Sequence, residues 1–137
     1  MIVVGAAIIR DGMLLAAQRA DPPALAGGWE FPGGKVDPGE SDHEALIREC
    51  QEELGVRVAL HDRIGGEWPL GPEVLMRIWT AELVEGEPKA LEHLALRWLP
   101  IDHLYDVEWL PGDLPVVAAI RRYLKTADKG GFPGPVE

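Results

Sequence analysis

Three glutamates, Glu49, Glu52 and Glu53, lie close together in the sequence, shortly after the adjacent glycines Gly33 and Gly34. If this region is helical, a rotation of about 100° per residue places the three carboxylates on one side of the helix. Carboxylates crowded in this way repel one another unless a cation lies among them. Mg²⁺ and Mn²⁺ prefer oxygen ligands, and Mg²⁺ is usually bound jointly with substrate phosphates. The pattern therefore predicts a divalent-metal site that serves phosphoryl chemistry.

The same helical wheel separates these acids from an apolar side, which carries Ile47, Cys50 and Leu54. Ala45 falls among the carboxylates, and its small side chain would leave space there for a ligand. The alternative is an ordinary solvated face, on which Arg48 pairs with Glu52 at the i,i+4 spacing.

A helix over residues 42–54 is the element that must position these acids. Ser41 and Glu44 form an S-x-x-E capping box at its start, and Gly55 lies where a left-handed C-terminal cap is expected. A second helix is predicted to follow Asp113 and to end at residue 124, with Pro115 in its first turn.

Strands are predicted on both sides of the first helix, at residues 2–10, 13–19, 29–31, 56–64, 73–84 and 94–99. The first two flank the dipeptide Asp11-Gly12, which is typical of a tight hairpin turn. Strands before and after a central helix, followed by another helix, indicate an α/β fold in which a mixed sheet lies between helices.

The length of 137 residues favours one domain, and the net charge of −10 argues against a nucleic acid polymer as partner. Cys50 is the only cysteine, so the chain can form no internal disulfide, and a cytoplasmic location is expected. The apolar run at the start is about nine residues long, too short to cross a membrane. The Gly- and Pro-rich tail, residues 125–137, is expected to be mobile.

Gly34, Glu40 and the run RECQEELGV at residues 48–56 resemble the Nudix box, G-x5-E-x7-R-E-U-x-E-E-x-G-U, where U is a bulky aliphatic residue. Every fixed position matches, and Cys50 replaces the first aliphatic residue. Residues 18–36 and 92–113 resemble MutT-like nucleoside triphosphate pyrophosphohydrolases, the CTP and dCTP type most closely. The resemblance covers residues 2–124. It implies a Nudix domain over residues 1–124 with the Nudix α/β/α sandwich and its mixed β-sheet.

The resemblance also implies a role for each matching residue. The expected ligands of Mg²⁺, for which Mn²⁺ would substitute, are Glu49, Glu52, Glu53, Glu92 and the backbone carbonyl of Gly33. Arg48 would brace the loop and helix by an ion pair with Glu40. Arg19 and Lys35 resemble residues that contact phosphates. Either Glu49 or Glu92 would act as general base, and the sequence leaves this choice open.

Recognition of the base is expected outside the box. Asp113 occupies the position of a polar residue that reads the base edge in MutT-like proteins. An ionised carboxylate accepts hydrogen bonds, so it suits cytosine N4, guanine N1 and N2, or the N7–H of an 8-oxo purine. Phe31 and Trp109 would stack on the base. The alternatives are an N-cap role for Asp113 and plain core packing for the two aromatic residues.

The expected reaction is Mg²⁺-dependent hydrolysis of a nucleoside or deoxynucleoside triphosphate to the monophosphate and pyrophosphate, with cytidine nucleotides favoured. Sanitation of oxidised nucleotides such as 8-oxo-dGTP is the first alternative. Hydrolysis of a nucleoside diphosphate-sugar such as ADP-ribose is the second alternative, because Pro72, which lies 16 residues after Val56, matches a feature of ADP-ribose hydrolases. The third is a non-catalytic nucleotide-binding module, although such modules usually lose some of the acids of the box. His93 adjoins Glu92, but no ligand spacing gives it a role.

Overall fold

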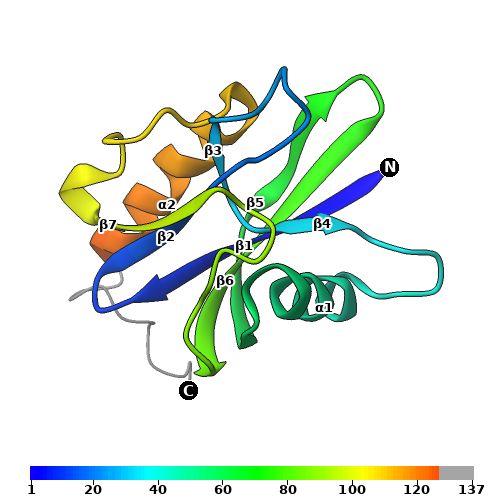
Figure 1. The fold of residues 1–137 in the computed structure, drawn as a ribbon, viewed down its shortest axis with the longest axis horizontal. Helices are drawn as coiled ribbons and strands as arrows, with labels where there is room; N and C mark the ends of the chain where they lie inside the picture. The colour runs from blue at the N-terminus through cyan, green and yellow to red at the C-terminus, as the bar shows by residue number, and fades with distance from the viewer. Residues whose placement is uncertain (127–137) are drawn as a thin grey trace.

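The Asp11-Gly12 turn joins the first two strands, β1 (Ile2–Arg10) and β2 (Met13–Gln18), in a computed structural model of the chain that describes residues 1–126 (Figure 1). Both turn residues have positive φ, 51° for Asp11 and 76° for Gly12, as a tight two-residue hairpin turn requires. The strands pair antiparallel from Arg10 opposite Met13. The predicted hairpin is confirmed.

The remaining strands complete one mixed sheet of seven strands. They are β3 (Trp29–Glu30), β4 (Gly33–Lys35), β5 (Arg57–Gly71), β6 (Val74–Glu85) and β7 (Ala95–Pro100). The order is β3-β2-β1-β6-β5, with β4 paired to β1 and β7 paired to β2. β1 and β6 run parallel, whereas the other pairs run antiparallel.

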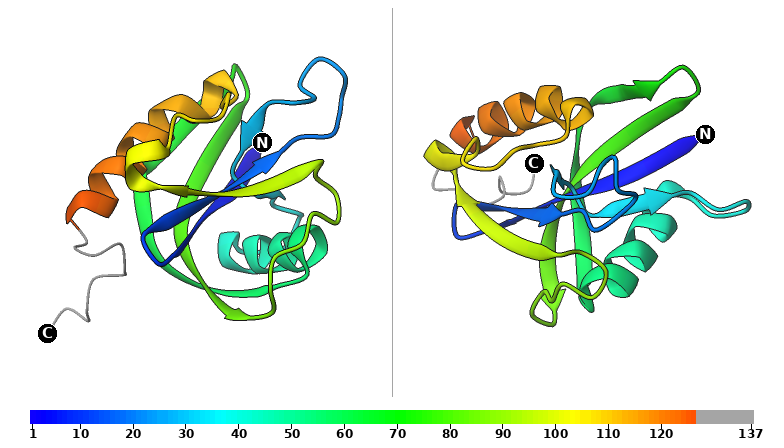
Figure 2. Two further views of the ribbon diagram at one scale, coloured as in Figure 1. Left: turned by 60° about the vertical axis from the view of Figure 1, so that its left-hand side comes forward. Right: turned by 45° about the horizontal axis from the view of Figure 1, so that its top comes forward.

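Two α-helices cover the sheet, α1 (Asp42–Leu54) and α2 (Leu114–Thr126), and two short 3-10 helices precede α2, η1 (Ile101–His103) and η2 (Pro111–Asp113). The predicted capping box of α1 is present, because the Ser41 hydroxyl accepts from the Glu44 N–H and the Glu44 carboxylate accepts from the Ser41 N–H. At the other end, the Gly55 N–H donates to the Gln51 carbonyl. Figure 2 shows the two α-helices on different sides of the strands.

The side chains of β1 alternate between two apolar cores, one under each helix. Val4, Ala6 and Ile8 belong to the core that α1 covers, whereas Ala7 and Ile9 belong to the core that α2 covers. This alternation follows from the two-residue period of a strand. The predicted α/β/α sandwich with a mixed sheet is therefore confirmed.

Two stretches outside the predicted strands are strands. β5 continues to Gly71 instead of ending at residue 64, and it passes Gly65 and Pro69 through register shifts that let these residues stay in the strand. The double glycine forms β4, which pairs with β1 through Gly33 opposite Gly5 and Gly34 opposite Val4. β4 therefore brings the glycine segment against the centre of the sheet.

The end of the described chain differs slightly from the prediction. α2 reaches Thr126, two residues beyond the predicted end at 124. The mobile tail is predicted for residues 125–137. Residues 127–137 lie outside the described residues. Within residues 1–126, neither α-helix has the length and apolar character needed to cross a membrane.

Candidate active site

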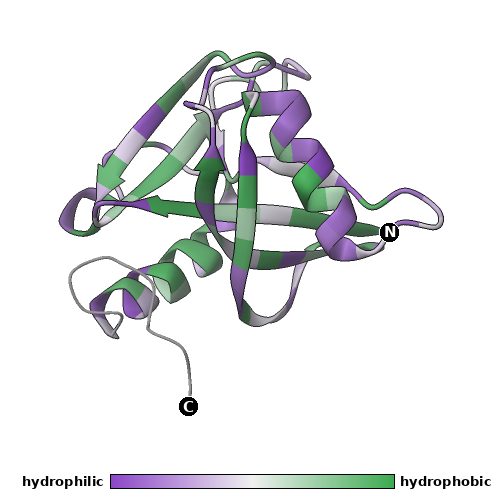
Figure 3. Cartoon of the chain, turned by 90° about the horizontal axis from the view of Figure 1, so that it is seen from below, coloured by the Kyte–Doolittle hydropathy of each residue, from purple (hydrophilic) through white to green (hydrophobic). Residues whose placement is uncertain are grey.

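The acids of α1 do not all face away from the core, and this corrects the predicted division of the helix. Ala45, predicted to leave space among the carboxylates, is fully buried in the core, while Ile47 is exposed. The side chain of Glu49 is only 16% exposed, whereas that of Glu52 is 49% exposed. The outward side of α1 is largely hydrophilic (Figure 3). The helix is thus rotated so that Glu49 and Glu53 lie at the edge of its buried side, towards β4.

The double glycine lets the backbone of β4 approach both β1 and the carboxylates of α1. A Cβ atom at Gly33, whose φ is +153°, would overlap the carbonyl oxygen of Val4. A Cβ at Gly34 would lie 2.5 Å from Oε2 of Glu49. The N–H of Gly33 donates to Oε1 of Glu53 over 3.1 Å. The two glycines therefore allow both carboxylates to lie directly on the strand.

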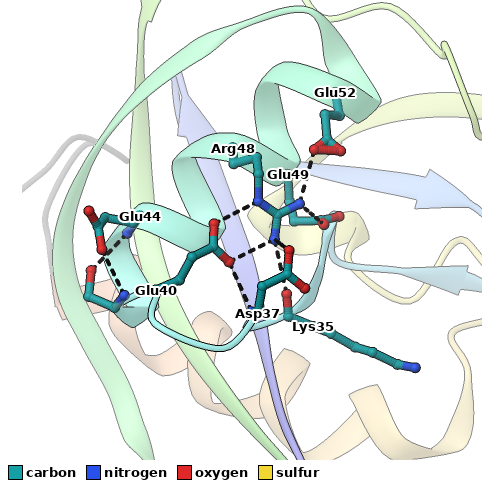
Figure 4. Close-up of polar contacts among 8 residues, drawn as sticks. Lys35, Asp37, Glu40, Glu44, Arg48, Glu49 and Glu52 are labelled. Atoms are coloured by element: carbon teal, nitrogen blue, oxygen red, sulfur yellow. Dashed lines mark hydrogen bonds and ion pairs between the residues drawn. The ribbon is translucent and has the colours of Figure 1, made fainter.

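Arg48 joins the loop before α1 to the acids on it (Figure 4). Its guanidinium donates to both oxygens of Glu40, at 2.7 Å from Nε and 2.9 Å from Nη2. Its Nη1 donates to Glu49 at 2.7 Å and to Glu52 at 3.0 Å. The hydrogen bonds from Arg48 hold the pKa of Glu40 at about 2, and those from the three glutamates raise the pKa of Arg48. The predicted ion pair between Arg48 and Glu40 is thus present.

A cavity of about 1080 Å³ lies beside α1 and β4. The predicted site residues in its lining are Arg19, Phe31, Gly33, Lys35, Glu49, Glu53, Glu92 and Asp113. The predicted residues outside its lining are Arg48, Glu52 and Trp109. The fold thus brings together most of the predicted site from five separate parts of the sequence. The side chain of Lys35 extends away from the Arg48 cluster in Figure 4.

The residues predicted to contact the base are Phe31, Trp109 and Asp113. The rings of Phe31 and Trp109 stack with their centroids 5.1 Å apart, and Trp109 Nε1 donates to the carbonyl of Leu104 over 2.6 Å. Phe31 lines the cavity and Trp109 does not, so Trp109 supports Phe31 from within the core. This packing is the alternative that the sequence left open for Trp109.

Asp113 is buried, with 6% of its surface exposed, and it faces the cavity. Burial raises the pKa of its carboxyl to about 7; the charge of Glu30 adds to this rise and Arg19 opposes it. Asp113 is the last residue of η2, directly before α2, and within residues 1–126 its side chain accepts no hydrogen bond from the backbone of either helix. The N-cap alternative therefore does not describe this carboxyl.

Comparisons with known proteins agree with this geometry. The NUDIX domain profile matches residues 1–123. The chain belongs to the Nudix family. A protein of Mycobacterium tuberculosis named putative 8-oxo-dGTP diphosphatase 2 is 45% identical over 126 residues, which cover 90% of this chain and 89% of that protein. The CTP pyrophosphohydrolase of Escherichia coli is 38% identical over 122 residues, which cover 87% of this chain and 90% of that protein.

A solved structure supports the same assignment. The crystal structure of a MutT Nudix hydrolase from Burkholderia pseudomallei superposes with a TM-score of 0.72 at 32% identity, covering 87% of this chain and 96% of that one. This chain is therefore a MutT-like Nudix hydrolase, an enzyme of nucleotide substrates.

Nudix hydrolases generally need a divalent metal such as Mg²⁺, and the acids of this cavity fit one chemically. Burial raises the pKa of Glu53 to about 8, although the Gly33 N–H opposes the rise. Three like charges raise it further, those of Glu49, Glu30 and Glu92. The same crowding of hard carboxyl oxygens that raises the pKa of Glu53 suits Mg²⁺, which prefers such ligands. Within residues 1–126, however, no three potential ligand side chains already converge on one point, and Arg48 holds Glu49 and Glu52.

Two residues of this Nudix site lack a signal in the sequence, Glu30 and His93. Both line the cavity. Oε1 of Glu30 accepts from Arg19 Nη1 at 3.0 Å, and Oε2 bonds with His93 Nε2 at 3.1 Å. His93 therefore lies at the cavity, a position that no spacing in the sequence indicates. The partners Glu30 and His93 are 63 residues apart, so no local spacing could have revealed the pair.

Proposed function

We propose that this Nudix hydrolase converts nucleoside or deoxynucleoside triphosphates into the monophosphate and pyrophosphate, with cytidine nucleotides favoured. The observation that carries the proposal is a single cavity lined both by Glu49 and Glu53 and by Phe31 and Asp113. A triphosphate near the first pair would have its base within reach of the second pair. Glu30 lies close enough to Glu53 and Asp113 to raise the pKa of each, so the two parts of the cavity adjoin.

In the proposed reaction a water attacks phosphorus in line and pyrophosphate leaves. The residues that would hold Mg²⁺ are Glu49, Glu52, Glu53, Glu92 and the carbonyl of Gly33. Bound Mg²⁺ would polarise the phosphate oxygens and lower the pKa of the attacking water. Glu49 or Glu92 accepts the proton of the water as general base. Lys35 is exposed at the cavity, where its ammonium group can contact the phosphates.

The buried carboxyl of Asp113 supports the preference for cytidine. With a pKa of about 7, this carboxyl is protonated in a large part of the molecules at neutral pH. A protonated carboxyl donates one hydrogen bond and accepts another. Cytosine offers the matching pair of groups, because N3 accepts and the N4 amino group donates. The aromatic face of Phe31 is the proposed stacking surface for the same base.

Sanitation of 8-oxo-dGTP is the second candidate. The relative that is 45% identical carries the name putative 8-oxo-dGTP diphosphatase 2. The chemistry of Asp113 also admits it, because the ionised carboxylate can accept from two N–H groups on a guanine edge. The two candidates share the reaction and differ only in the base.

A hydrolysis panel with Mg²⁺ tests the proposal, using CTP, dCTP, dGTP, 8-oxo-dGTP and ADP-ribose with the products separated. We expect monophosphate plus pyrophosphate, formed fastest from a cytidine nucleotide. A preference for 8-oxo-dGTP would support the proposed reaction and contradict the proposed preference for cytosine. Cleavage of ADP-ribose alone, or binding of nucleotides without hydrolysis, would contradict the proposed reaction.

A further inference from the structure

The segment between β6 and β7, residues 86–94, carries Glu92 to the cavity and has few attachments near it. Its backbone is held by a hydrogen bond on each side of Glu92 and His93. The N–H of Leu91 donates to the carbonyl of Glu53 at 3.2 Å, and the N–H of Leu94 donates to the carbonyl of Gln18 at 2.8 Å. Between these two bonds lie only Glu92 and His93. The position of the Glu92 carboxylate therefore depends on what holds this dipeptide.

His93 is the inward-facing side chain of this short stretch. Its side chain is 5% exposed, whereas Leu91 and Leu94 are both exposed, and Glu92 is exposed as well. The imidazole contacts the cavity wall through Nε2, which lies 3.1 Å from Oε2 of Glu30 on β3. The apolar residues beside it contribute little anchoring, because they are largely in solvent.

Glu30 is itself held by a second side-chain contact and by its strand. Its other oxygen, Oε1, accepts from Arg19 Nη1 at 3.0 Å, and the Arg19 Nε donates to the backbone carbonyl of Asp21 at 2.7 Å. Glu30 also lies on β3, a short strand that pairs with β2 at the edge of the sheet. The hydrogen bond to His93 therefore attaches the Glu92 segment to a strand of the sheet.

The bond needs no particular charge on the imidazole. Glu30 only accepts, so Nε2 carries a hydrogen whether the ring is neutral or protonated. The other nitrogen, Nδ1, is buried and has no hydrogen-bond partner within the described residues. A ring that leaves one buried nitrogen unpaired is poorly explained as core packing alone. The orientation of His93 is thus the one that serves Glu30.

We propose that His93 is a positioning residue, which fixes the Glu92 carboxylate at the cavity by donating a hydrogen bond from Nε2 to Glu30. This inference rests on the proposed function, in which Glu92 is a metal ligand or the general base. His93 itself touches neither substrate nor metal in this role. Loss of the bond frees the dipeptide between its two backbone attachments and lets Glu92 leave its productive place.

Three substitutions separate the hydrogen bond from the volume of the ring. His93→Gln keeps an N–H donor near the position of Nε2. His93→Asn has a donor only near the position of Nδ1, too short to reach Glu30, and His93→Leu has none. His103→Leu is the matched control, because His103 also bonds with a carboxylate, that of Asp106, but is exposed and outside the cavity.

Amide hydrogen exchange tests the anchor without any need for hydrolysis. We expect exchange at Leu91 and Leu94 to accelerate by about tenfold in His93→Leu and His93→Asn, and to stay near the wild-type rate in His93→Gln and His103→Leu. Equal exchange in the Gln and Asn variants, or no change in any variant, would overturn the proposal. This result stands even if the wild-type protein hydrolyses no nucleotide, an outcome that would refute the proposed function instead.

Steady-state kinetics on the best substrate then test whether the anchor acts through Glu92. In His93→Leu we expect kcat to fall by about 10-fold or more, with KM changed less than about twofold, and His93→Gln to recover most of the loss. In a Glu92→Gln background the same Leu substitution should cost less than about twofold in kcat. An equal loss in both backgrounds would show that His93 does not act through Glu92.

Discussion

Two carboxyls of this cavity, the half-buried Glu53 and the buried Asp113, hold their protons more tightly than ordinary acids do. Burial is the main cause in each case, and the charge of Glu30 adds to both. Their surroundings differ in one respect. Glu53 has further carboxylates beside it, whereas Asp113 has Arg19. One carboxyl is therefore suited to receive a cation, and the other to exchange a proton with the edge of a base.

The protonation of Asp113 predicts that base preference depends on pH. Below its pKa of about 7 the neutral carboxyl complements the N3 and N4 groups of cytosine, and above it the carboxylate complements two N–H groups of guanine. We expect the ratio of kcat/KM for dCTP over dGTP to fall several-fold between about pH 6 and pH 8. Asp113→Asn carries a fixed donor and acceptor, so its ratio should be flat. A flat ratio in the wild type would contradict this role.

For Glu53 we predict opposite effects on stability and activity. Its pKa is raised to about 8 in the folded state, so its ionisation weakens folding as pH rises from the unfolded value of about 4.3 through 8. In EDTA at pH 8.5, Glu53→Gln should raise the free energy of unfolding by roughly 1–3 kcal/mol, and at pH 5 by much less. The same variant should lose turnover by about 100-fold or more.

Denaturant titrations at both pH values check the stability, and the hydrolysis assay checks the turnover. Glu85→Gln, an exposed glutamate at the end of β6, is the control and should change neither. A Glu53→Gln protein that is less stable than wild type at pH 8.5 would show that the ionised carboxylate of Glu53 does not destabilise the folded state.

At the scale of elements, α1 and β4 form one functional unit through the glycine pair. The substitutions Gly34→Ala and Gly33→Ala distinguish two contributions of the pair, room for the Glu49 carboxylate and close backbone packing of β4 against β1. At Gly34 the added Cβ would displace only the end of the Glu49 side chain, so activity should fall by about 10- to 100-fold while the fold persists. At Gly33 the Cβ would collide with the Val4 backbone at positive φ, and stability should fall by about 2 kcal/mol or more. Thermal unfolding and hydrolysis assays measure both; equal effects of the two changes would contradict this division.

The elements also show what a sequence can predict here. The bounds of α1 follow from its capping box and Gly55, which are local signals. The end of β5 does not, because Gly65 and Pro69 are typical of loops and only pairing with β6 keeps them in a strand. The acids proposed to hold the metal, Glu49, Glu52 and Glu53, belong to a continuous motif, so the sequence alone indicates them. The bond between Glu30 and His93 joins distant segments, so it became visible only in the folded chain.

For the whole molecule, the net charge of −10 means that bound cations should stabilise the fold. A ligand that binds only the folded state at about 100 times its Kd adds about 2.7 kcal/mol. For a chain of this size we expect saturating Mg²⁺ to raise the Tm by roughly 5–15 °C relative to EDTA. Calorimetry measures the shift, which Glu49→Gln should reduce and Glu85→Gln should not. An undiminished shift in Glu49→Gln would place the cation elsewhere.

The single cysteine gives the fold a built-in reporter. Cys50 has no exposed surface between α1 and the sheet, and burial raises the pKa of its thiol to about 12. Only the thiolate reacts readily with alkylating reagents, and only after it meets solvent. The alkylation rate of the native enzyme therefore reports how often Cys50 becomes exposed, by opening of α1 from the sheet or by global unfolding. Because the same helix carries Glu49 and Glu53, a nucleotide bound in the cavity should slow the alkylation of Cys50.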